Sequence, residues 1–380
     1  MFNKKSYKKN AYMLNGSFKK KGYDWWWHSF TAYNHETKEA KAFYIEFFII
    51  NPGLYPDKII LGQDEENKKN GLKPSYLMIN VGTWGKVHKQ LHRFFPINNV
   101  SINKCPIEIK ADDCYLSETD IKGSVDVKNP TPQMMSDEGF MSWNLKIKKD
   151  IAWNVGYGTS SIFRFLKAFE MYWHSNGMKT LYEGEIIFDG IKYDVVPDIS
   201  YGYSDKNWGS DFTSPWVWLS SCHMIRKETK EELHNSVFDI GGGRPKAFGI
   251  KFNRKLLAAY YIEGKEIEMN FSKFLHPCKT VFSSTNDESK VYWDVVQENR
   301  KYRIITHISC KQSDMLLINY EAPDGSKRHN HLWNGGNGVG EMKIFRKGKK
   351  DSATLIEDIE LYNVGCEYGE FSLNTNVDKK

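Results

Sequence analysis

Short strand-like segments separated by turn residues recur along most of the chain. Between residues 75 and 150, and again from residue 248 onward, apolar or alternating runs are interrupted by Gly, Pro, Asn or Asp about every ten residues. This spacing is typical of all-β sandwiches and barrels. Aromatic residues, which favour strands over helices, make up 14% of the sequence. We therefore expect a mainly β protein with few short helices.

The chain has 380 residues, more than twice the length of a typical domain, so we expect two domains or one large β structure. The segment SSIFRFLKAFEMYW (160–173) has apolar residues at helical spacing and predicts one short helix. Asp189-Gly190, between two strand-like runs, predicts a tight hairpin. We place the division near residue 197, with β units at 23–196 and 197–380.

The formal net charge of +6 comes from the start of the chain. Seven of the 53 Lys and Arg residues precede Asp24, the first acidic residue, and the remainder has 46 basic against 47 acidic residues. A general nucleic-acid surface is therefore not expected. We expect residues 1–22 to form a flexible lysine-rich arm, which would make at most a peripheral contact with anionic lipid.

Targeting and membrane signals are not evident in the sequence. The longest apolar run, residues 42–50, is interrupted by Glu46, and the lysine-rich start lacks the apolar core of a secretory signal. These features favour a soluble cytoplasmic protein. The sequence does not indicate an oligomeric state.

The stretch YGYSDKNWGSDFTSPWVWLSS (201–221) combines three tryptophans with two carboxylates, a lysine and an asparagine. A solvent loop does not need three indoles, and an inert core does not tolerate so many charges without partners. The stretch therefore predicts a functional site. Among its residues Asp205 is our first candidate for a catalytic acid.

A second aromatic cluster, DWWWH (24–28), opens a predicted hairpin whose second strand ends near Ile50. On that second strand Glu46 shares a face with Tyr44, Phe48 and Ile50. A carboxyl among aromatic rings should have a raised pKa, which suits a general acid. An ion pair at a barrel rim is the alternative role for Glu46.

Other segments that suggest a cofactor or metal site do not match the complete motifs. The glycine-rich segments at 239–249 and 334–342 match neither the dinucleotide nor the P-loop pattern and read as turns or bulges. His329 and His331 lack a third ligand at a workable distance, and the six cysteines contain no CxxC pair. We therefore expect neither a metal nor a cofactor.

The sequence resembles the tocopherol cyclase-like proteins, and more distantly the hydroxyneurosporene synthase (carotenoid 1,2-hydratase) and AttH group. The motif that carries the resemblance is YSDKNWG (203–209) followed by WVW (216–218). Two weaker similarities are WHSNGM (173–178) and DWWWH (24–28). The resemblance implies two consecutive lipocalin-like (calycin) antiparallel β-barrels with a hydrophobic cavity.

The resemblance also implies cofactor-independent acid chemistry on a double bond of a hydrophobic prenylated, polyene or phenolic molecule. Protonation would be followed by capture of the cation by an internal hydroxyl (a cyclase) or by water (a hydratase). Asp205 is the expected acid, Glu46 the second candidate, and His174 the third, as an acid or base partner. The expected substrate-binding residues are Trp25, Trp26, Trp27, Tyr203, Lys206, Asn207, Trp208, Trp216 and Trp218.

Two other function classes remain open from the residues. A lipocalin-like carrier would hold a lipid or pigment in the same cavity without changing it. A carbohydrate-active β-sandwich would stack sugars on exposed tryptophans and use two carboxylates about 5–9.5 Å apart.

Overall fold

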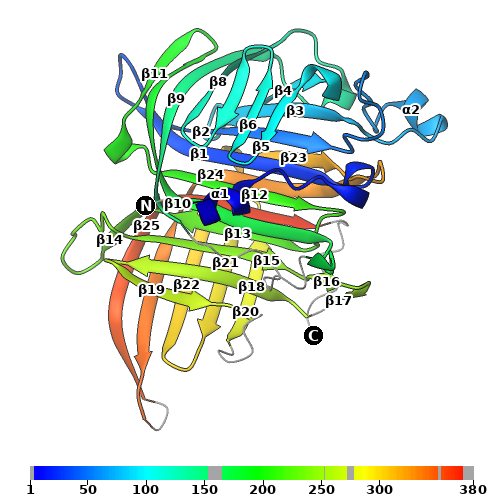
Figure 1. Ribbon diagram of the computed structural model, residues 1–380. Helices are drawn as coiled ribbons and strands as arrows, with labels where there is room; N and C mark the ends of the chain where they lie inside the picture. Colours follow the sequence, from blue (N-terminus) through cyan, green and yellow to red (C-terminus); the bar gives the residue numbers. More distant parts are fainter. Residues whose placement is uncertain (1–3, 153–164, 252, 272–277, 350–351, 371–380) are drawn as a thin grey trace.

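The computed structural model describes residues 4–152, 165–251, 253–271, 278–349 and 352–370, which form two large antiparallel sheets (Figure 1). Burial alternates along some strands, such as those at 139–147 and 290–298, whereas the strands at 23–32, 42–50, 76–83 and 202–209 are buried on both faces. The prediction of a mainly β, lipocalin-like fold with few short helices is confirmed.

Among these residues the first sheet has 12 strands and the order β4-β3-β2-β1-β11-β10-β9-β8-β7-β6-β5, with β12 paired to β1 and β10. The strands are β1 (Tyr23–Asn34), β2 (Ala40–Ile50), β3 (Tyr76–Thr83), β4 (Lys89–Phe95), β5 (Ser101–Lys104), β6 (Ile107–Ala111), β7 (Cys114–Ser117), β8 (Asp120–Val127), β9 (Gly139–Ile151), β10 (Met171–Phe188), β11 (Ile191–Val195) and β12 (Gly202–Gly209).

The second sheet has 11 strands within the described ranges and the order β19-β18-β15-β13-β25-β24-β22-β21-β20, with β14 paired to β25 and β23 to β24. Its strands, together with the separate β16–β17 hairpin, are β13 (Trp216–Ser221), β14 (His223–Arg226), β15 (Val237–Gly243), β16 (Lys246–Ala247), β17 (Ile250–Lys251), β18 (Lys255–Ile262), β19 (Lys265–Met269), β20 (Lys279–Asn286), β21 (Lys290–Glu298), β22 (Tyr302–Lys311), β23 (Leu316–Glu321), β24 (Lys327–Lys347) and β25 (Ala353–Glu370).

Helices are short throughout the described part of the chain. They are α1 (Lys4–Asn10), α2 (Glu65–Lys69) and the 3₁₀ turns η1 (Gly16–Lys19), η2 (Ile97–Asn99), η3 (Pro132–Met134), η4 (Pro197–Ile199) and η5 (Gln312–Asp314). No helix in these ranges is long and apolar enough to span a bilayer. The helix expected at 160–173 falls partly outside the described residues, and its last residues, from Met171, form the start of β10 instead.

The boundary between the two sheets differs from the expected one near residue 197. Strands β11 and β12 lie end to end between β1 and β10, so that both fill one position of the first sheet. The chain crosses to the second sheet only between Gly209 and Trp216. The crowded stretch at 201–221 therefore does not open the second unit, because its first half completes the first sheet and its second half begins the next.

The N-terminal segment is not a free arm from Asn10 onward, contrary to our expectation for residues 1–22. Asn10, Leu14 and Phe18 are buried. The carbonyl oxygen of Asn10 accepts a hydrogen bond from Trp26 Nε1 at 3.0 Å. This segment packs on the first sheet and contributes to its core.

Three apolar clusters hold the fold together. One lies within the first sheet and one within the second. The third contains residues of both sheets, including Trp25, Trp27, Trp173, Trp216 and Trp218. The two sheets are therefore joined by an aromatic-rich interface, and the candidate site lies in it.

Candidate active site

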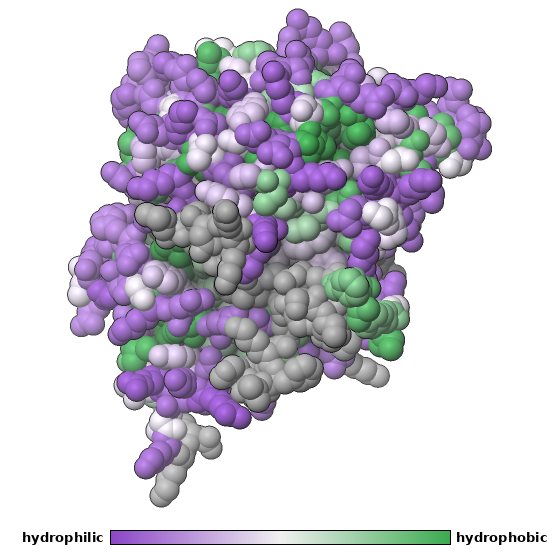
Figure 2. All heavy atoms as spheres, in the orientation of Figure 1, coloured by the Kyte–Doolittle hydropathy of each residue, from purple (hydrophilic) through white to green (hydrophobic). Residues whose placement is uncertain are grey.

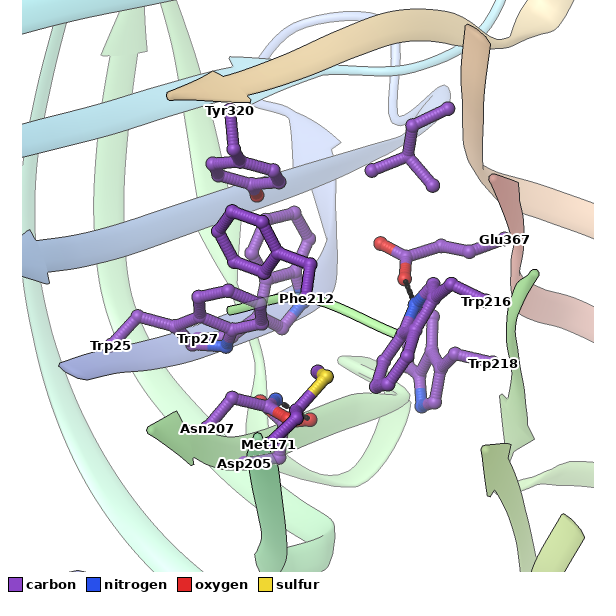
Figure 3. A pocket seen from close by; sticks show the side chains of 11 residues that line it. Trp25, Trp27, Met171, Asp205, Asn207, Phe212, Trp216, Trp218, Tyr320 and Glu367 are labelled. Atoms are coloured by element: carbon purple, nitrogen blue, oxygen red, sulfur yellow. Dashed lines mark hydrogen bonds between the residues drawn. The ribbon is translucent and has the colours of Figure 1, made fainter. Parts of the chain in front are cut away.

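A pocket opens between the two sheets rather than inside either barrel (Figure 3). Its free volume with the side chains in this arrangement is small, about 20 Å³, which is the space of a water molecule. Six of its side chains are aromatic and two are carboxylates; the lining residues are Trp25, Trp27, Met171, Asp205, Asn207, Phe212, Trp216, Trp218, Tyr320, Leu332 and Glu367. None of these eleven described residues is a lysine, arginine or histidine.

Strand register determines which predicted residues reach the pocket. In the antiparallel pairing of β1 with β12, Trp25 is opposite Asn207 and Trp27 is opposite Asp205. Paired side chains lie on the same face of a sheet, and successive residues alternate between faces. Tyr203, Asp205 and Asn207 therefore point toward the second sheet together with Trp25 and Trp27.

Three predicted substrate-binding residues, Trp26, Lys206 and Trp208, lie on the opposite face of the first sheet, away from the pocket. Lys206 is fully buried there and forms an ion pair with Asp24. Its ammonium lies 3.9 Å from the ring centre of Trp26 and 5.5 Å from that of Trp208. The alternation of side chains along β1 and β12 removes these residues from the site and makes them part of the first core.

Burial shifts the pKa of both partners in this ion pair. Desolvation raises the pKa of Asp24 to about 6, although the attraction of Lys206 opposes it. Desolvation likewise lowers the pKa of Lys206 to about 8, opposed by the charge of Asp24. Both groups are therefore charged near neutral pH, and the pair is structural.

His174 also lies away from the pocket. It is paired with Lys206 across β10 and β12, so its side chain shares the face of Lys206 and not that of Asp205. Its neighbour Trp173 takes the pocket-side face instead and donates a hydrogen bond from Nε1 to Asp205 Oδ2 at 2.7 Å. We expected His174 to be the partner of the acid Asp205, but Trp173 makes that contact.

Asp205 is buried and has one carboxylate oxygen fully engaged. Besides Trp173, Tyr203 OH donates to Oδ2 at 3.1 Å and Asn207 Nδ2 donates to it at 3.4 Å. The other oxygen, Oδ1, is buried and has no hydrogen-bond partner among the described residues. Desolvation raises the pKa of Asp205 to about 7, helped by the charge of Glu367 and opposed by these three donors.

Tyr203 connects Asp205 to a second buried carboxyl, Asp239 of β15. The Tyr203 hydroxyl is 3.1 Å from Asp205 Oδ2 and 3.2 Å from Asp239 Oδ2. Trp218 Nε1 donates to the other oxygen of Asp239 at 3.2 Å. Desolvation, followed by the charge of Asp205, raises the pKa of Asp239 well above its usual value.

Glu367 forms the carboxylate on the second sheet's side of the pocket. It accepts hydrogen bonds from Trp216 Nε1 at 2.6 Å and from Asn334 Nδ2. Desolvation raises its pKa to about 7, opposed by these two donors. Trp218, on the same wall, packs over Gly365, where a Cβ atom would lie 2.2 Å from the indole ring. That close approach requires glycine.

Glu46 does not line the pocket but lies behind Tyr320, whose hydroxyl donates to Glu46 Oε2 at 3.1 Å. Asn80 Nδ2 donates to the same oxygen at 2.8 Å, and Oε1 is buried without a hydrogen-bond partner in the ranges that the structure describes. Desolvation raises the pKa of Glu46 to about 8, opposed by those donors. Asp205, Asp239, Glu46 and Glu367 form no ion pair with any described residue.

Several site residues were missed by the sequence analysis. Asp239 was read as part of a glycine-rich turn and Glu367 as part of an ordinary alternating strand. Each is a lone acid in an apolar or glycine-rich strand segment, which is the same signal that singled out Glu46. The aromatic residues Phe212 and Tyr320 gave no separate signal. No group of three or more metal-ligating side chains occurs in the described ranges.

Comparisons with known proteins bear on the family. The profile of the family described as tocopherol cyclase-like matches residues 75–367, more than half of the chain. No curated protein sequence gives a significant match.

Solved structures give remote likenesses that extend over nearly the whole chain. An AttH-like protein from Nitrosomonas europaea is 13% identical, with a TM-score of 0.44, over 92% of this chain and 94% of its own. CghA, solved with Sch210972, is 10% identical with a TM-score of 0.47, over 92% and 89%. Kievitone hydratase from Nectria haematococca is 9% identical with a TM-score of 0.36, again over 92% and 89%.

Proposed function

The chain belongs to the tocopherol cyclase-like family, and from this premise we propose that it is an acid–base enzyme of the isomerase (cyclase) or hydratase type. Its substrate is a hydrophobic prenylated, polyene or phenolic molecule with a reactive double bond. The single observation that carries the proposal is Asp205 Oδ1, a buried carboxyl oxygen in an aromatic pocket that accepts no hydrogen bond from the described part of the chain. An unpartnered oxygen is available to a substrate, and a pKa of about 7 keeps the acid partly protonated at neutral pH.

The reaction begins when Asp205 transfers its proton to one carbon of the double bond. A C–H bond forms, the O–H bond breaks, and the neighbouring carbon becomes a cation. Trp25, Trp27, Trp216 and Trp218 line this space, and an indole face that a cation reaches stabilises it by about 0.5–2 kcal/mol. The carboxylate of Glu367 adds a favourable charge.

An oxygen nucleophile then captures the cation. In a cyclase this is a hydroxyl of the substrate, and in a hydratase it is water. The new oxonium loses one proton, which returns to the carboxylate of Asp205, so the cycle consumes no net acid. The choice between the two nucleophiles depends on whether water enters with the substrate.

Tyr203 and Asp239 hold the Asp205 carboxyl in place and stabilise it while its proton is on the substrate. When Asp205 has given up its proton from Oδ1, its Oδ2 accepts a stronger hydrogen bond from the Tyr203 hydroxyl, which also contacts Asp239. The proton that returns from the oxonium restores the starting state. Glu46 supports Tyr320 in the pocket wall, and we assign His174 and Lys206 no chemical role.

The proposal is tested by incubating the protein with a panel of prenylated phenols and polyenes in D₂O. Proton transfer from Asp205 predicts a product with one deuterium bound to carbon, formed by the wild-type protein and by Asp198→Asn, an exposed control. Asp205→Asn should form none. A ligand that binds tightly but is recovered without deuterium and unchanged would instead identify a lipocalin-like carrier.

A further inference from the structure

Four large apolar side chains are exposed close together beside the interface of the two sheets. They are Phe165 (84% exposed), Leu166 (52%), Phe248 (64%) and Ile250 (67%), and we call them the apolar tip. The two segments that carry them are joined by a hydrogen bond from the Phe248 N–H to the Ala168 carbonyl oxygen at 2.9 Å. Figure 2 shows the hydrophobic protrusion formed at the β16–β17 hairpin.

The turn of the β16–β17 hairpin has a phenylalanine, Phe248, at a position whose backbone conformation disfavours bulky residues. Phe248 and Gly249 have φ angles of 48° and 81°, the left-handed pair of a type I′ turn. Asn-Gly or Asp-Gly makes this turn with less strain, because a bulky residue at positive φ is disfavoured. The phenylalanine is therefore costly both for the turn and for its exposure to water, which indicates a role for the ring itself.

Lysines surround the apolar tip. Lys167, Lys246 and Lys251 lie on the same two segments. Lys167 donates hydrogen bonds to the Asn15 carbonyl oxygen and to Ser17 Oγ, each at 3.1 Å, and so adjoins the exposed run Lys19, Lys20 and Lys21. Two carboxylates lie among these lysines: Glu170, which is 3.7 Å from the Lys246 ammonium, and Asp211, whose charge acts on Glu170. Basic charge predominates around the tip.

We propose that the apolar tip and its lysines form a docking surface for an anionic lipid bilayer. Apolar rings that reach the acyl boundary, flanked by lysines at the level of the head groups, are the arrangement that binds peripheral proteins to such membranes. The charge of the surface selects anionic over zwitterionic lipid. The inference goes beyond the proposed function and holds whether or not Asp205 is catalytic.

The same segment connects the docking surface to the pocket. Met171, which lines the pocket, is three residues beyond Ala168. The carbonyl oxygen of Glu170 accepts hydrogen bonds from the N–H groups of Ser210 at 2.8 Å and Asp211 at 3.2 Å, next to the pocket residue Phe212. A molecule dissolved in the bilayer would thus meet the protein next to the pocket residues Met171 and Phe212. The surface extends the lipid contact expected of the N-terminal segment, because Lys19, Lys20 and Lys21 belong to its basic surroundings.

The proposal is tested by co-sedimentation of the full chain with vesicles of phosphatidylcholine, alone or with phosphatidylserine. We expect binding to the phosphatidylserine vesicles that weakens with added salt, and little binding to phosphatidylcholine alone. Phe248→Asn with Ile250→Ser should lower partitioning about ten-fold or more, the effect of losing two large apolar side chains at the interface. Asparagine suits the positive φ of the turn, so this variant should fold at least as well as the parent.

The matched control is Ile187→Ser with Ile191→Ser, which removes two exposed apolar residues at the far hairpin of the first sheet and should leave partitioning unchanged. Lys251→Glu should weaken binding to phosphatidylserine vesicles only. The proposal fails if the wild-type protein does not bind phosphatidylserine vesicles, or if the tip and control variants lose binding equally. A tip variant that only dissociates an oligomer would reassign the surface to self-association and also overturn it.

Discussion

The hydroxyl of Tyr203 lies within hydrogen-bonding distance of two carboxyls, 3.1 Å from Asp205 Oδ2 and 3.2 Å from Asp239 Oδ2. A phenol has a single proton and can donate only one of these hydrogen bonds. The second of the two contacts is a hydrogen bond only if the carboxyl group in that contact is protonated and donates to the Tyr203 oxygen. The geometry therefore favours a state in which Asp205 and Asp239 together hold at least one proton, and the two groups titrate as a pair.

Replacing Asp239 should change the pH dependence of catalysis more than its maximum. Asp239→Asn removes the second carboxyl that competes for the Tyr203 hydroxyl proton. Tyr203 then donates to Asp205 alone and stabilises its carboxylate, so the apparent pKa that limits activity on the basic side should fall below about 7. The kcat/KM profile would show this as a shift toward lower pH. Asp294→Asn, an exposed control that contacts His307, should leave the profile in place. An unchanged profile in Asp239→Asn would disprove the coupling.

Asp205→Asn should abolish turnover without preventing binding. The amide keeps the size of the side chain but cannot donate the reactive proton, and general acid catalysis contributes about 10²–10⁴-fold to rate. We expect kcat to fall by that factor while the Kd for substrate, measured by tryptophan fluorescence, changes little. Retained kcat would show that another group protonates the substrate.

Glu46 should make the protein less stable as the pH rises. Its pKa is about 8 in the folded protein, against 4.5 for a free side chain, so the folded state holds this proton more tightly. The free energy of unfolding therefore falls between pH 4.5 and 8, by at most about 1.4 kcal/mol per pH unit.

Glu46→Gln removes this contribution, so urea unfolding should give a smaller loss of stability from pH 5 to pH 8 than the wild type shows. Glu108→Gln, on the exposed side of β6, is the control. Equal slopes for Glu46→Gln and the wild type would mean that Glu46 is ionised in the folded state.

The sequence predicted the fold class because strand patterns and turn residues are local signals. Asp189-Gly190, for example, forms the tight β10–β11 hairpin that it predicts, with both residues at positive φ. It did not predict the sheet boundary, since the pairing of β12 with β1 depends on residues about 180 positions apart. Local patterns carry no information about which distant strand becomes the neighbour.

The same distinction explains the site. Asp205 stood out because it is a charged residue between tryptophans, and Asp205, Trp25 and Trp216 do reach one pocket. Lys206 stood out equally and faces the other way, because adjacent strand residues point to opposite faces. Side chains alternate between the two faces of a strand, so the sequence alone already places Lys206 and Trp208 on the face opposite to Asp205. The position of Glu367 in the pocket could not be predicted from the sequence, because it depends on which strands of the two sheets face each other.

Lys206 should prove essential for stability rather than for binding. Lys206→Met removes the ion-pair partner of the buried Asp24 and should lower the free energy of unfolding at pH 7 by about 3–5 kcal/mol, the usual cost of breaking a buried ion pair from one side. Lys206→Met combined with Asp24→Asn should recover most of that loss. A loss under about 1 kcal/mol in the single variant, together with weaker ligand binding, would return Lys206 to the site.

A stable cation should bind the pocket better than its neutral counterpart. A lipophilic tertiary amine is protonated at neutral pH, and its positive charge is attracted by indole faces and by the Glu367 carboxylate. The neutral carbon isostere has the same shape but lacks this attraction. We expect the amine to bind about ten-fold more tightly or better, and Glu367→Gln to reduce the difference. Fluorescence quenching of the pocket tryptophans provides the measurement, and equal affinities would argue against cation stabilisation.

The protonation state of Asp205 tests the central claim without requiring a substrate. Carboxyl carbons of aspartate labelled with ¹³C can be followed by NMR as the pH is raised, and Asp205→Asn identifies the signal. The account predicts that Asp205 titrates with a midpoint of about 7, as part of its pair with Asp239. A midpoint near 4 or lower would show an ionised carboxylate at neutral pH, and Asp205 could not then be the acid.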